Sequence, residues 1–279
     1  MKLWIIGRNG MLSRALQRKC REKGIDFVAT SRKEVDVEDE AALKAQFETL
    51  HFSHVINCSG YTAVDLAEEE KERAYALNAE GVALLAKLSA LHKKKLIHFS
   101  TDYVFDGKEK EYHEEAETAP LSVYGKSKEE GEKLLHKHHP QALLIRTSWL
   151  FGKEGNHFVK TMIRLMQEKE EVHVVDDQWG RPTYADDLAE ETLTLLDDSG
   201  IVHYANHGET TWHGFAEVIK KKLEEKKVAF KCQKIKPIST KTFDAKASRP
   251  LSAILKTKRF SPRHWEEGLE EVIDHVTQP

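Results

Sequence analysis

The sequence predicts an α/β fold built on a doubly wound parallel sheet, and two features carry this prediction. Short apolar runs rich in Val, Ile, Leu and Phe alternate with longer helical stretches through the first half of the chain, as is typical of strands buried on both faces and of the helices that cover them. Strands that alternate with helices need crossover connections, which make neighbouring strands parallel. This order therefore predicts one sheet with helices on both faces.

The expected strands and helices alternate from the N-terminus onward. Strands are expected at residues 3–6, 27–29, 55–57, 96–99 and 143–145, and helices at 11–23, 38–50, 71–93 and 123–138. The pattern loosens after about residue 150, where helices are expected around 186–197, 213–226 and 264–276. We therefore expect a first domain over residues 1–150 and a smaller lobe over residues 151–279, some segments of which return to the first domain.

Composition indicates an ordinary globular protein without an electrostatic surface for nucleic acid. The 279 residues carry a formal net charge of -3, with 40% hydrophobic and 32% charged residues, which gives no basic stripe to bind phosphates. The apolar run at residues 3–6 is too short for a signal peptide, and no stretch approaches the roughly 20 apolar residues of a membrane span. We expect a cytoplasmic protein with no nucleic-acid or membrane partner.

Cysteines and histidines give no sign of a disulfide or a metal. The three cysteines show no C-x-x-C spacing, which predicts reduced thiols. The histidines at positions 136, 138 and 139 fall at the end of an expected helix, where adjacent positions do not face one another. No metal site is expected.

The first strand-to-helix turn predicts a dinucleotide site and reads Gly7-Arg8-Asn9-Gly10-Met11-Leu12-Ser13. Glycines here permit a tight turn and let the backbone approach a pyrophosphate, whose charge the N-terminus of the following helix receives. We assign Gly7, Asn9, Gly10, Met11 and Leu12 to cofactor binding, which would make residues 1–150 a Rossmann-type NAD(P)-binding domain. Ser13 stands where a glycine is usual for close helix packing. The alternative is an ordinary strand-to-helix loop.

The end of the second strand bears on which dinucleotide is bound. Ser31 and Arg32 lie where an acidic residue would hold the ribose hydroxyls of NAD, and a hydroxyl with a guanidinium suits a 2′-phosphate. NADPH is therefore expected, while NADH stays possible if Arg32 is only a surface charge. Asp36 either approaches the adenine or caps the helix that follows.

Tyr124 and Lys128 are the candidate catalytic pair. Residues four apart share one face of a helix, so the Lys128 ammonium can lie beside the Tyr124 phenol and lower its pKa from the ordinary value of about 10. A phenol tuned in this way is a general acid. The alternative is a pair on a solvated helix face. Thr101, upstream, is the third candidate, although it could equally be a strand-end residue that satisfies the backbone.

Further motifs follow one another along the chain in a consistent order. They are Gly7-x-x-Gly10, residues 57–65 (NCSGYTAVD), 100–107 (STDYVFDG), 120–128 (PLSVYGKSK), 146–152 (RTSWLFG), 155–159 (GNHFV), 177–188 (DQWGRPTYADDL), 208–212 (GETTW) and Arg249-Pro250. Together they resemble the extended short-chain dehydrogenase/reductases, and within these the dTDP-4-dehydrorhamnose reductase family. The resemblance covers nearly the whole chain.

The resemblance implies a role for each matching residue. Tyr124 would protonate the 4-keto oxygen of a nucleotide-linked deoxysugar as the nicotinamide of NADPH delivers hydride, Lys128 would bind the nicotinamide ribose, and Thr101 would hydrogen-bond the same oxygen. Cofactor contacts would also come from Cys58, Ser59, Gly60 and Tyr61. The implied substrate contacts are Asp102, Tyr103, Trp149, Asn156 and Trp179, with Arg181 and Arg249 for the diphosphate. Each tryptophan could instead be core packing.

Other functions in the superfamily stay open at this point. Dehydratases tend to place Asp-Glu after the threonine, and Asp102-Tyr103 does not match that pattern; an epimerase is a related alternative. A non-catalytic regulatory subunit is kept open by Ser13 and by Leu251-Ser252 after Arg249-Pro250, where the family usually has Asn-Ser before the leucine. The partner expected is the nucleotide sugar, and the protein could be a monomer or a homodimer.

Overall fold

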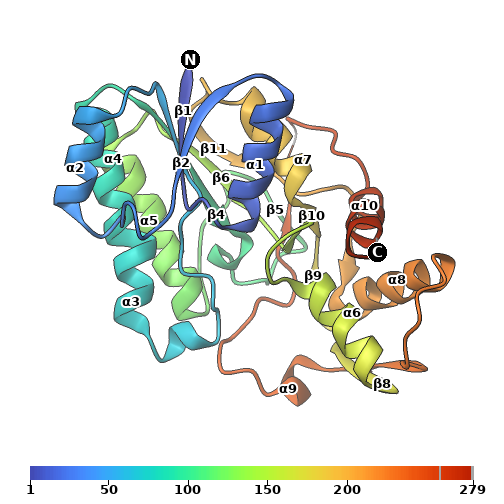
Figure 1. Cartoon of the computed structure of the whole chain (residues 1–279). Coiled ribbons are helices and arrows are strands. Elements are labelled where there is room, and N and C mark those ends of the chain that lie inside the picture. The colour runs from blue at the N-terminus through green and yellow to red at the C-terminus, as the bar shows by residue number, and fades with distance from the viewer. Residues whose placement is uncertain (258, 278–279) are drawn as a thin grey trace.

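A six-stranded parallel sheet forms the centre of the larger part of the molecule (Figure 1). The computed structural model describes residues 1–257 and 259–277. Every neighbouring pair of strands in this sheet is parallel, which confirms the predicted doubly wound class. The strands, in their order across the sheet, are β11 (Gly200–His203), β6 (Leu143–Thr147), β4 (Lys95–Thr101), β3 (His54–Asn57), β1 (Lys2–Ile6) and β2 (Asp26–Thr30).

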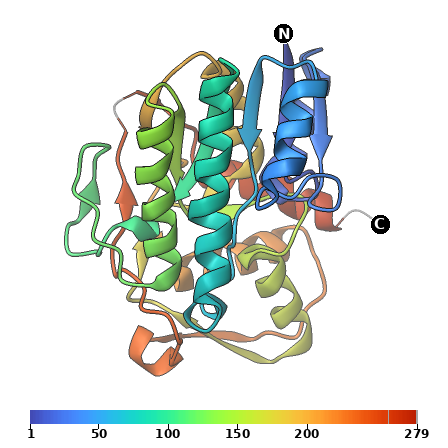
Figure 2. The ribbon, with the colours of Figure 1, turned by 90° about the vertical axis from the view of Figure 1, so that its left-hand side faces the viewer.

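Helices cover both faces of this sheet (Figures 1 and 2). One face carries α1 (Met11–Glu22) and α7 (Ala185–Thr194), which pack against each other. The other carries α2 (Glu40–Thr49), α3 (Lys71–Tyr75), α4 (Gly81–Leu91) and α5 (Val123–His138). The helix predicted over 71–93 is present as α3 and α4 joined by a π-helical turn, η2 (Ala76–Glu80). Residues of η2 pack on α5, so this irregular turn lies beside the candidate catalytic helix.

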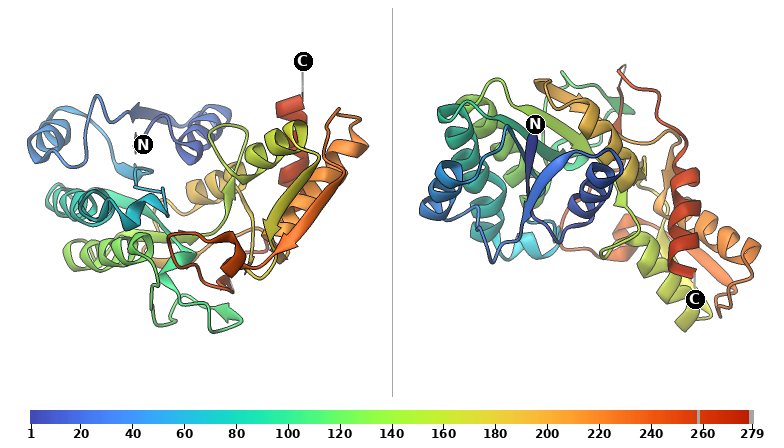
Figure 3. Two further views of the ribbon diagram at one scale, coloured as in Figure 1. Left: turned by 90° about the horizontal axis from the view of Figure 1, so that it is seen from below. Right: turned by 45° about the horizontal axis from the view of Figure 1, so that its top comes forward.

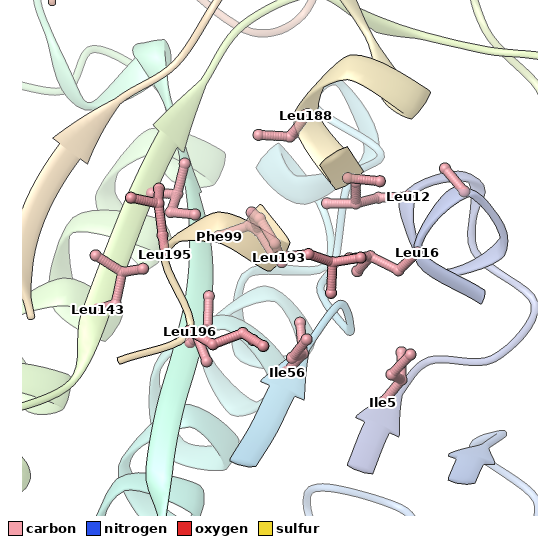
Figure 4. Close-up of a cluster of buried hydrophobic side chains, with 14 of the residues drawn as sticks. Ile5, Leu12, Leu16, Ile56, Phe99, Leu143, Leu188, Leu193, Leu195 and Leu196 are labelled. Atoms are coloured by element: carbon pink, nitrogen blue, oxygen red, sulfur yellow. The ribbon is translucent and has the colours of Figure 1, made fainter. Parts of the chain in front are cut away.

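Alternate residues of each strand point into two separate cores. Ile5 and Ile56 pack with Leu16 of α1 and Leu188 of α7 on one face (Figure 4). Trp4, the neighbour of Ile5 in β1, packs on the opposite face. Burial of one such side chain stabilises the fold by roughly 1.5–3 kcal/mol. The rigid sheet that results fixes the positions of the residues at its carboxyl edge.

A smaller lobe lies beside one end of the sheet (Figure 3). Its main elements are α6 (Phe158–Glu168), β8 (Glu171–Val175), α8 (Trp212–Glu225), β13 (Lys234–Ile238) and α10 (Trp265–Thr277). The strands β8 and β13 pair in parallel, and Phe215, Met166 and Trp265 belong to a core of the lobe's own. The sequence did not predict α6, β8 or β13.

The remaining elements are short. They are η1 (Leu66–Glu68), η3 (Asp102–Val104), β5 (Glu111–Tyr112), β7 (Leu150–Phe151), β9 (Trp179–Gly180), β10 (Thr183–Tyr184), β12 (Thr210–Thr211), α9 (Thr240–Phe243) and β14 (Ile254–Leu255). Although both follow residue 150, β11 is a strand of the six-stranded sheet and α7 packs on α1, which covers one face of that sheet. The division into a domain at residues 1–150 and a lobe at residues 151–279 stays a prediction, with residues 185–203 assigned to the first domain. None of the described helices is both long and apolar enough to cross a membrane.

Candidate active site

A cavity of about 520 Å³ opens at the carboxyl ends of β1, β2 and β3. Ten of the residues assigned to the cofactor line it, grouped in three segments that follow these strands. They are Gly7, Asn9 and Gly10 after β1, Ser31, Arg32 and Asp36 after β2, and Cys58, Ser59, Gly60 and Tyr61 after β3. Parallel strands in an open α/β sheet bind ligands at this edge. The structure therefore brings these residues together, while their roles in binding stay predictions.

The turn after β1 leaves room only for backbone. Gly7 has φ of +88°, and a Cβ there would lie 3.1 Å from the carbonyl carbon and oxygen of Cys58. The Gly10 amide donates to the Gly7 carbonyl over 2.8 Å, and α1 begins at the next residue with no side chain capping its first amides. These free amides form a cradle for an anion, so the turn fits the pyrophosphate of a dinucleotide.

Ser13 fits the position where a glycine is usual. It is fully buried, and its hydroxyl accepts a hydrogen bond from Gln17 over 3.3 Å. Gln17 also donates to the carbonyl of Arg8 in the turn, at 2.9 Å. Ser13 thus supports the turn through Gln17. Two assigned neighbours do not line the cavity: Leu12 packs into the core, and the side chain of Met11 lies against Gly152 and Gly155.

Acidic side chains already hold the cations at the end of β2. The Ser31 hydroxyl donates to Glu34 over 2.6 Å, and Glu34 pairs with Arg8 at 2.8 Å. Arg32 is more than half exposed and pairs with Asp36 at 2.8 Å. A 2′-phosphate would therefore exchange with exposed ion pairs, which are individually weak.

Asp36 does not cap the next helix. The side chain of Asp39 accepts from the Ala42 amide and caps α2 instead. The capping alternative for Asp36 is wrong, because the helix begins three residues later than that alternative requires. Asp36 lines the cavity.

Two glycines let α5 pack closely against η3 and η2. A Cβ on Gly125 would lie 2.2 Å from the carbonyl oxygen of Tyr103, and one on Gly131 would lie 2.0 Å from that of Asn78 in η2. Ser122 caps the helix by accepting from the Gly125 amide at 3.1 Å. Tyr124 thus lies in the first turn of α5.

The surroundings of Tyr124 differ from the prediction. Burial raises the pKa of its phenol to about 12, the Thr101 hydroxyl acts in the lowering direction, and the Asp102 carboxylate raises the pKa further. Lys128 does not contribute, so the predicted lowering by Lys128 is wrong for this structure. The reason is the direction of the ammonium, which donates to the carbonyl of Phe99 in β4 over 2.6 Å. Burial also lowers the pKa of Lys128 to about 8, opposed by the charge of Glu132.

Thr101 ends β4 and organises the short helix η3. Its hydroxyl donates to the Asp102 carboxylate at 2.9 Å and accepts from the Tyr103 amide at 3.2 Å. Thr101 therefore satisfies the backbone, as its structural alternative requires, and also lies beside Tyr124. Burial raises the pKa of Asp102 to about 7, against the lowering effect of the Thr101 hydrogen bond. The rings of Tyr103 and Tyr124 meet edge to face with centroids 5.7 Å apart.

The two arginines assigned to the diphosphate each hold a carboxylate. Arg249 binds Asp65 through two nitrogen–oxygen contacts of 2.6 and 3.0 Å. Burial raises the pKa of the Tyr103 phenol, and the nearby Arg249 guanidinium opposes this rise. Arg181 pairs with Glu209 at 2.7 Å and donates to the carbonyl of Leu255. Arg249 therefore lies next to Tyr103, whose ring contacts that of Tyr124.

The other assigned substrate residues are spread over three segments of the chain. Trp149 stacks face to face on Trp212, with centroids 3.5 Å apart, which supports its core-packing alternative. Trp179 is 49% exposed, and its amide donates to the carbonyl of Leu251 at 2.7 Å. Asn156 is exposed in the loop before α6.

Sequence reasoning missed several residues around this site. Thr62, Leu66, Glu70 and Arg73 also line the cavity, and Glu68 accepts from the Val123 amide at the start of α5. The acidic run at 68–72 is typical of a solvated helix start, and only the tertiary structure turns part of it toward the site. The Tyr61 hydroxyl donates to Glu70 over 3.0 Å and so links the segment after β3 to the acidic run.

The fold and the site define an extended short-chain dehydrogenase/reductase, an NAD(P)H-dependent oxidoreductase. Residues 1–278 match the family described as RmlD substrate binding domain, and the chain belongs to this family. It is 34% identical to the spore coat polysaccharide biosynthesis protein SpsK of Bacillus subtilis, over 98% of this chain and 96% of that protein. It is also 34% identical to a dTDP-4-dehydrorhamnose reductase of Aggregatibacter actinomycetemcomitans, over 97% and 98%.

A solved structure agrees with this assignment. The crystal structure of a dTDP-4-dehydrorhamnose reductase from Bacillus anthracis in complex with NADP superimposes with a TM-score of 0.92. The two chains are 36% identical, and the match covers 98% of each. The likeness therefore extends through both lobes.

Proposed function

We propose that this protein reduces the 4-keto group of a nucleotide-linked deoxysugar with NADPH, converting dTDP-4-dehydro-L-rhamnose to dTDP-L-rhamnose. One observation carries the proposal: Thr101, Tyr124 and Lys128 gather at the carboxyl edge of β4, next to a glycine-lined cavity that fits a dinucleotide. Relatives that match nearly the full length of the chain are named for this reaction, and one holds NADP.

The chemistry needs a hydride donor, which NADPH supplies when bound, and a proton donor, which the chain supplies. Addition of hydride to a carbonyl carbon builds negative charge on the oxygen. Tyr124 keeps its proton at neutral pH, because its pKa is about 12, so it is available to protonate that oxygen. The one hydroxyl proton of Thr101, which the Asp102 carboxylate accepts in the structure, turns to the same oxygen when the substrate binds. A positioned acid together with this second donor lowers the barrier.

Lys128 supports the reaction from the cofactor side. Its ammonium lies near Gly60, where a Cβ would be 3.9 Å from Nζ, and Gly60 lines the cavity. We assign it to the nicotinamide ribose hydroxyls. Its hydrogen bond to Phe99 anchors the side chain to β4, and a locked side chain binds with a smaller loss of entropy.

The sugar and the diphosphate lie on the other side of Tyr124. The sugar packs against Tyr103, and Arg249 binds a phosphate oxygen, because a guanidinium can donate two parallel hydrogen bonds to such a group. Binding of the diphosphate there exchanges part of the contact with Asp65. The protein works in the cytoplasm on this small-molecule substrate, as a monomer or a homodimer, without a nucleic-acid or membrane partner.

A direct assay tests the proposal. Purified protein mixed with dTDP-4-dehydrorhamnose should oxidise NADPH in proportion to the sugar consumed. The control is dTDP-L-rhamnose, which has no 4-keto group and should leave NADPH unchanged. No oxidation of either NADPH or NADH with the keto sugar would overturn the proposal for this substrate.

A further inference from the structure

A buried histidine that the proposed mechanism does not use lies directly behind Lys128. His98 is 1% exposed in the middle of β4. Its Nε2 lies 3.4 Å from the Nζ of Lys128. Its Nδ1 lies 3.1 Å from Nδ2, the side-chain amide nitrogen of Asn57 on the neighbouring strand. The ring therefore has one neighbour at each nitrogen.

The orientation of the Asn57 amide is fixed from its other side. Its oxygen accepts from the backbone amide of Ser59 at 3.0 Å and from the Ser59 hydroxyl at 2.6 Å. A flipped amide would place its NH2 group against the Ser59 N–H. The nitrogen of Asn57 must therefore face His98, where it can only donate.

This orientation determines the tautomer of His98. Since Nδ1 accepts from Asn57, the proton of the neutral ring is on Nε2. Burial first, and then the charge of Lys128, lower the pKa of His98 well below its ordinary value, so the ring is neutral. The Nε2–H group therefore points at the amine of Lys128, which it can meet as a donor only.

We propose that His98 is a positioning residue for Lys128, and that the tautomer set by Asn57 opposes the ammonium and favours the neutral amine. The proposal rests on the reductase function for its effect on turnover. Ser59 lines the cavity, so hydrogen bonds run from the cofactor site through Asn57 to His98, and the Nε2 of His98 lies against the Nζ of Lys128.

The charged groups around Lys128 act in known directions. Glu132, one turn along α5, favours the ammonium, but its carboxylate is engaged by Arg146 at 2.6 Å. Tyr124, one turn back on α5, stays neutral, and the Asp102 carboxylate helps to raise the pKa of the Tyr124 phenol. His98 is the titratable group within hydrogen-bonding distance of Nζ among the described residues.

The first test observes the tautomer in the whole protein. Nitrogen-15 spectra of labelled wild-type protein at neutral pH should show His98 protonated at Nε2 and not at Nδ1. An Nδ1–H tautomer or a doubly protonated ring overturns the proposal. This measurement uses no sugar, so its outcome does not depend on the reductase function.

The second test follows NADPH affinity against pH by protein fluorescence, again without sugar. Affinity in the wild type should fall as pH rises through about 8, where Lys128 loses its proton. In His98→Gln the amide can rotate to accept from Lys128, so the midpoint should rise by about one pH unit. A midpoint that stays or falls, or weakening by the same factor at every pH, would show a merely structural role and overturn the proposal.

A matched control separates the effect from general loss of a buried histidine. His139 is also buried and its Nε2 lies 2.9 Å from the carbonyl oxygen of Lys94, at the far end of α5. His139→Gln should leave the midpoint at the wild-type pH. A shift equal to that of His98→Gln would overturn the proposal.

Discussion

The catalytic edge and the substrate side of the candidate site hold their side chains in different ways. At the catalytic edge, Lys128 is anchored by a backbone carbonyl and Tyr124 by the close approach of α5. On the substrate side, Arg181 and Arg249 are held by carboxylates that lie 28 and 184 residues away in the sequence. The first arrangement is held by backbone contacts that a ligand does not replace, whereas the second must exchange partners to bind a diphosphate.

This difference separates rate from affinity. Groups held by backbone are in place before substrate arrives, so their removal should lower turnover. Groups held by ion pairs act on binding, and their removal should chiefly raise the KM for the nucleotide sugar. The following changes test that separation.

Tyr124→Phe should have the largest effect. Loss of the proton donor lowers kcat by roughly 10²-fold to 10⁴-fold, while NADPH affinity stays near the wild-type value. The measurement is steady-state NADPH oxidation with the keto sugar. Tyr204→Phe is the control, because Tyr204 is buried in the core beneath the sheet and should keep full activity. Wild-type turnover in Tyr124→Phe would remove Tyr124 from its assigned role.

Arg249→Ala should raise the KM for the nucleotide sugar by roughly tenfold to a hundredfold with a smaller change in kcat, because it removes a charge-assisted hydrogen bond to phosphate. Asp65→Asn is the matched variant, since it weakens the ion pair and leaves the guanidinium for the substrate; its KM should stay level or fall. If both variants raise KM equally, the pair acts only by holding the loop.

Gly131→Ala tests whether α5 is held by its close contact with η2. The added Cβ would meet the carbonyl of Asn78 at 2.0 Å, and such overpacking costs about 1–3 kcal/mol of unfolding free energy. Denaturant unfolding gives the measurement, and kcat should fall with it because Tyr124 moves. Lys133→Ala, on the exposed face of the same helix, should change neither, and an unaffected Gly131→Ala would show that the contact is not needed.

Arg32→Ala should have the smallest effect. Its ion pairs are exposed, so its loss should reduce the preference for NADPH over NADH by only about 2-fold to 5-fold. The measurement is the affinity of Arg32→Ala for NADPH and for NADH. Lys33→Ala is the control and should keep the wild-type preference. An unchanged preference would mean that Arg32 does not contact the 2′-phosphate.

The same contrast explains what could be predicted from the sequence. The bounds of α5 follow from hydrophobic periodicity and a local cap, and the parallel class of the sheet follows from the alternation of strands and helices. The gathering of Gly7, Ser31 and Cys58 at one cavity follows from the rule that parallel strands end at the same edge.

What the sequence did not predict depends on contacts between distant segments. The strands β8 and β13 are each five residues long and pair across more than 50 residues of sequence, so neither shows a pattern that favours that pairing. The direction of the Lys128 ammonium is set by Phe99 and His98 on β4 and not by its spacing from Tyr124. Partners of Arg181 and Arg249 were missed for the same reason.

The central claim is that this site transfers hydride to C4 of a nucleotide-linked keto sugar. The most direct measurement is a reaction with NADPH deuterated at the transferable position of the nicotinamide, followed by NMR of the isolated sugar nucleotide. The account predicts one deuterium at C4 of dTDP-L-rhamnose. Product without deuterium at C4, or sugar recovered with its keto group intact, would contradict it.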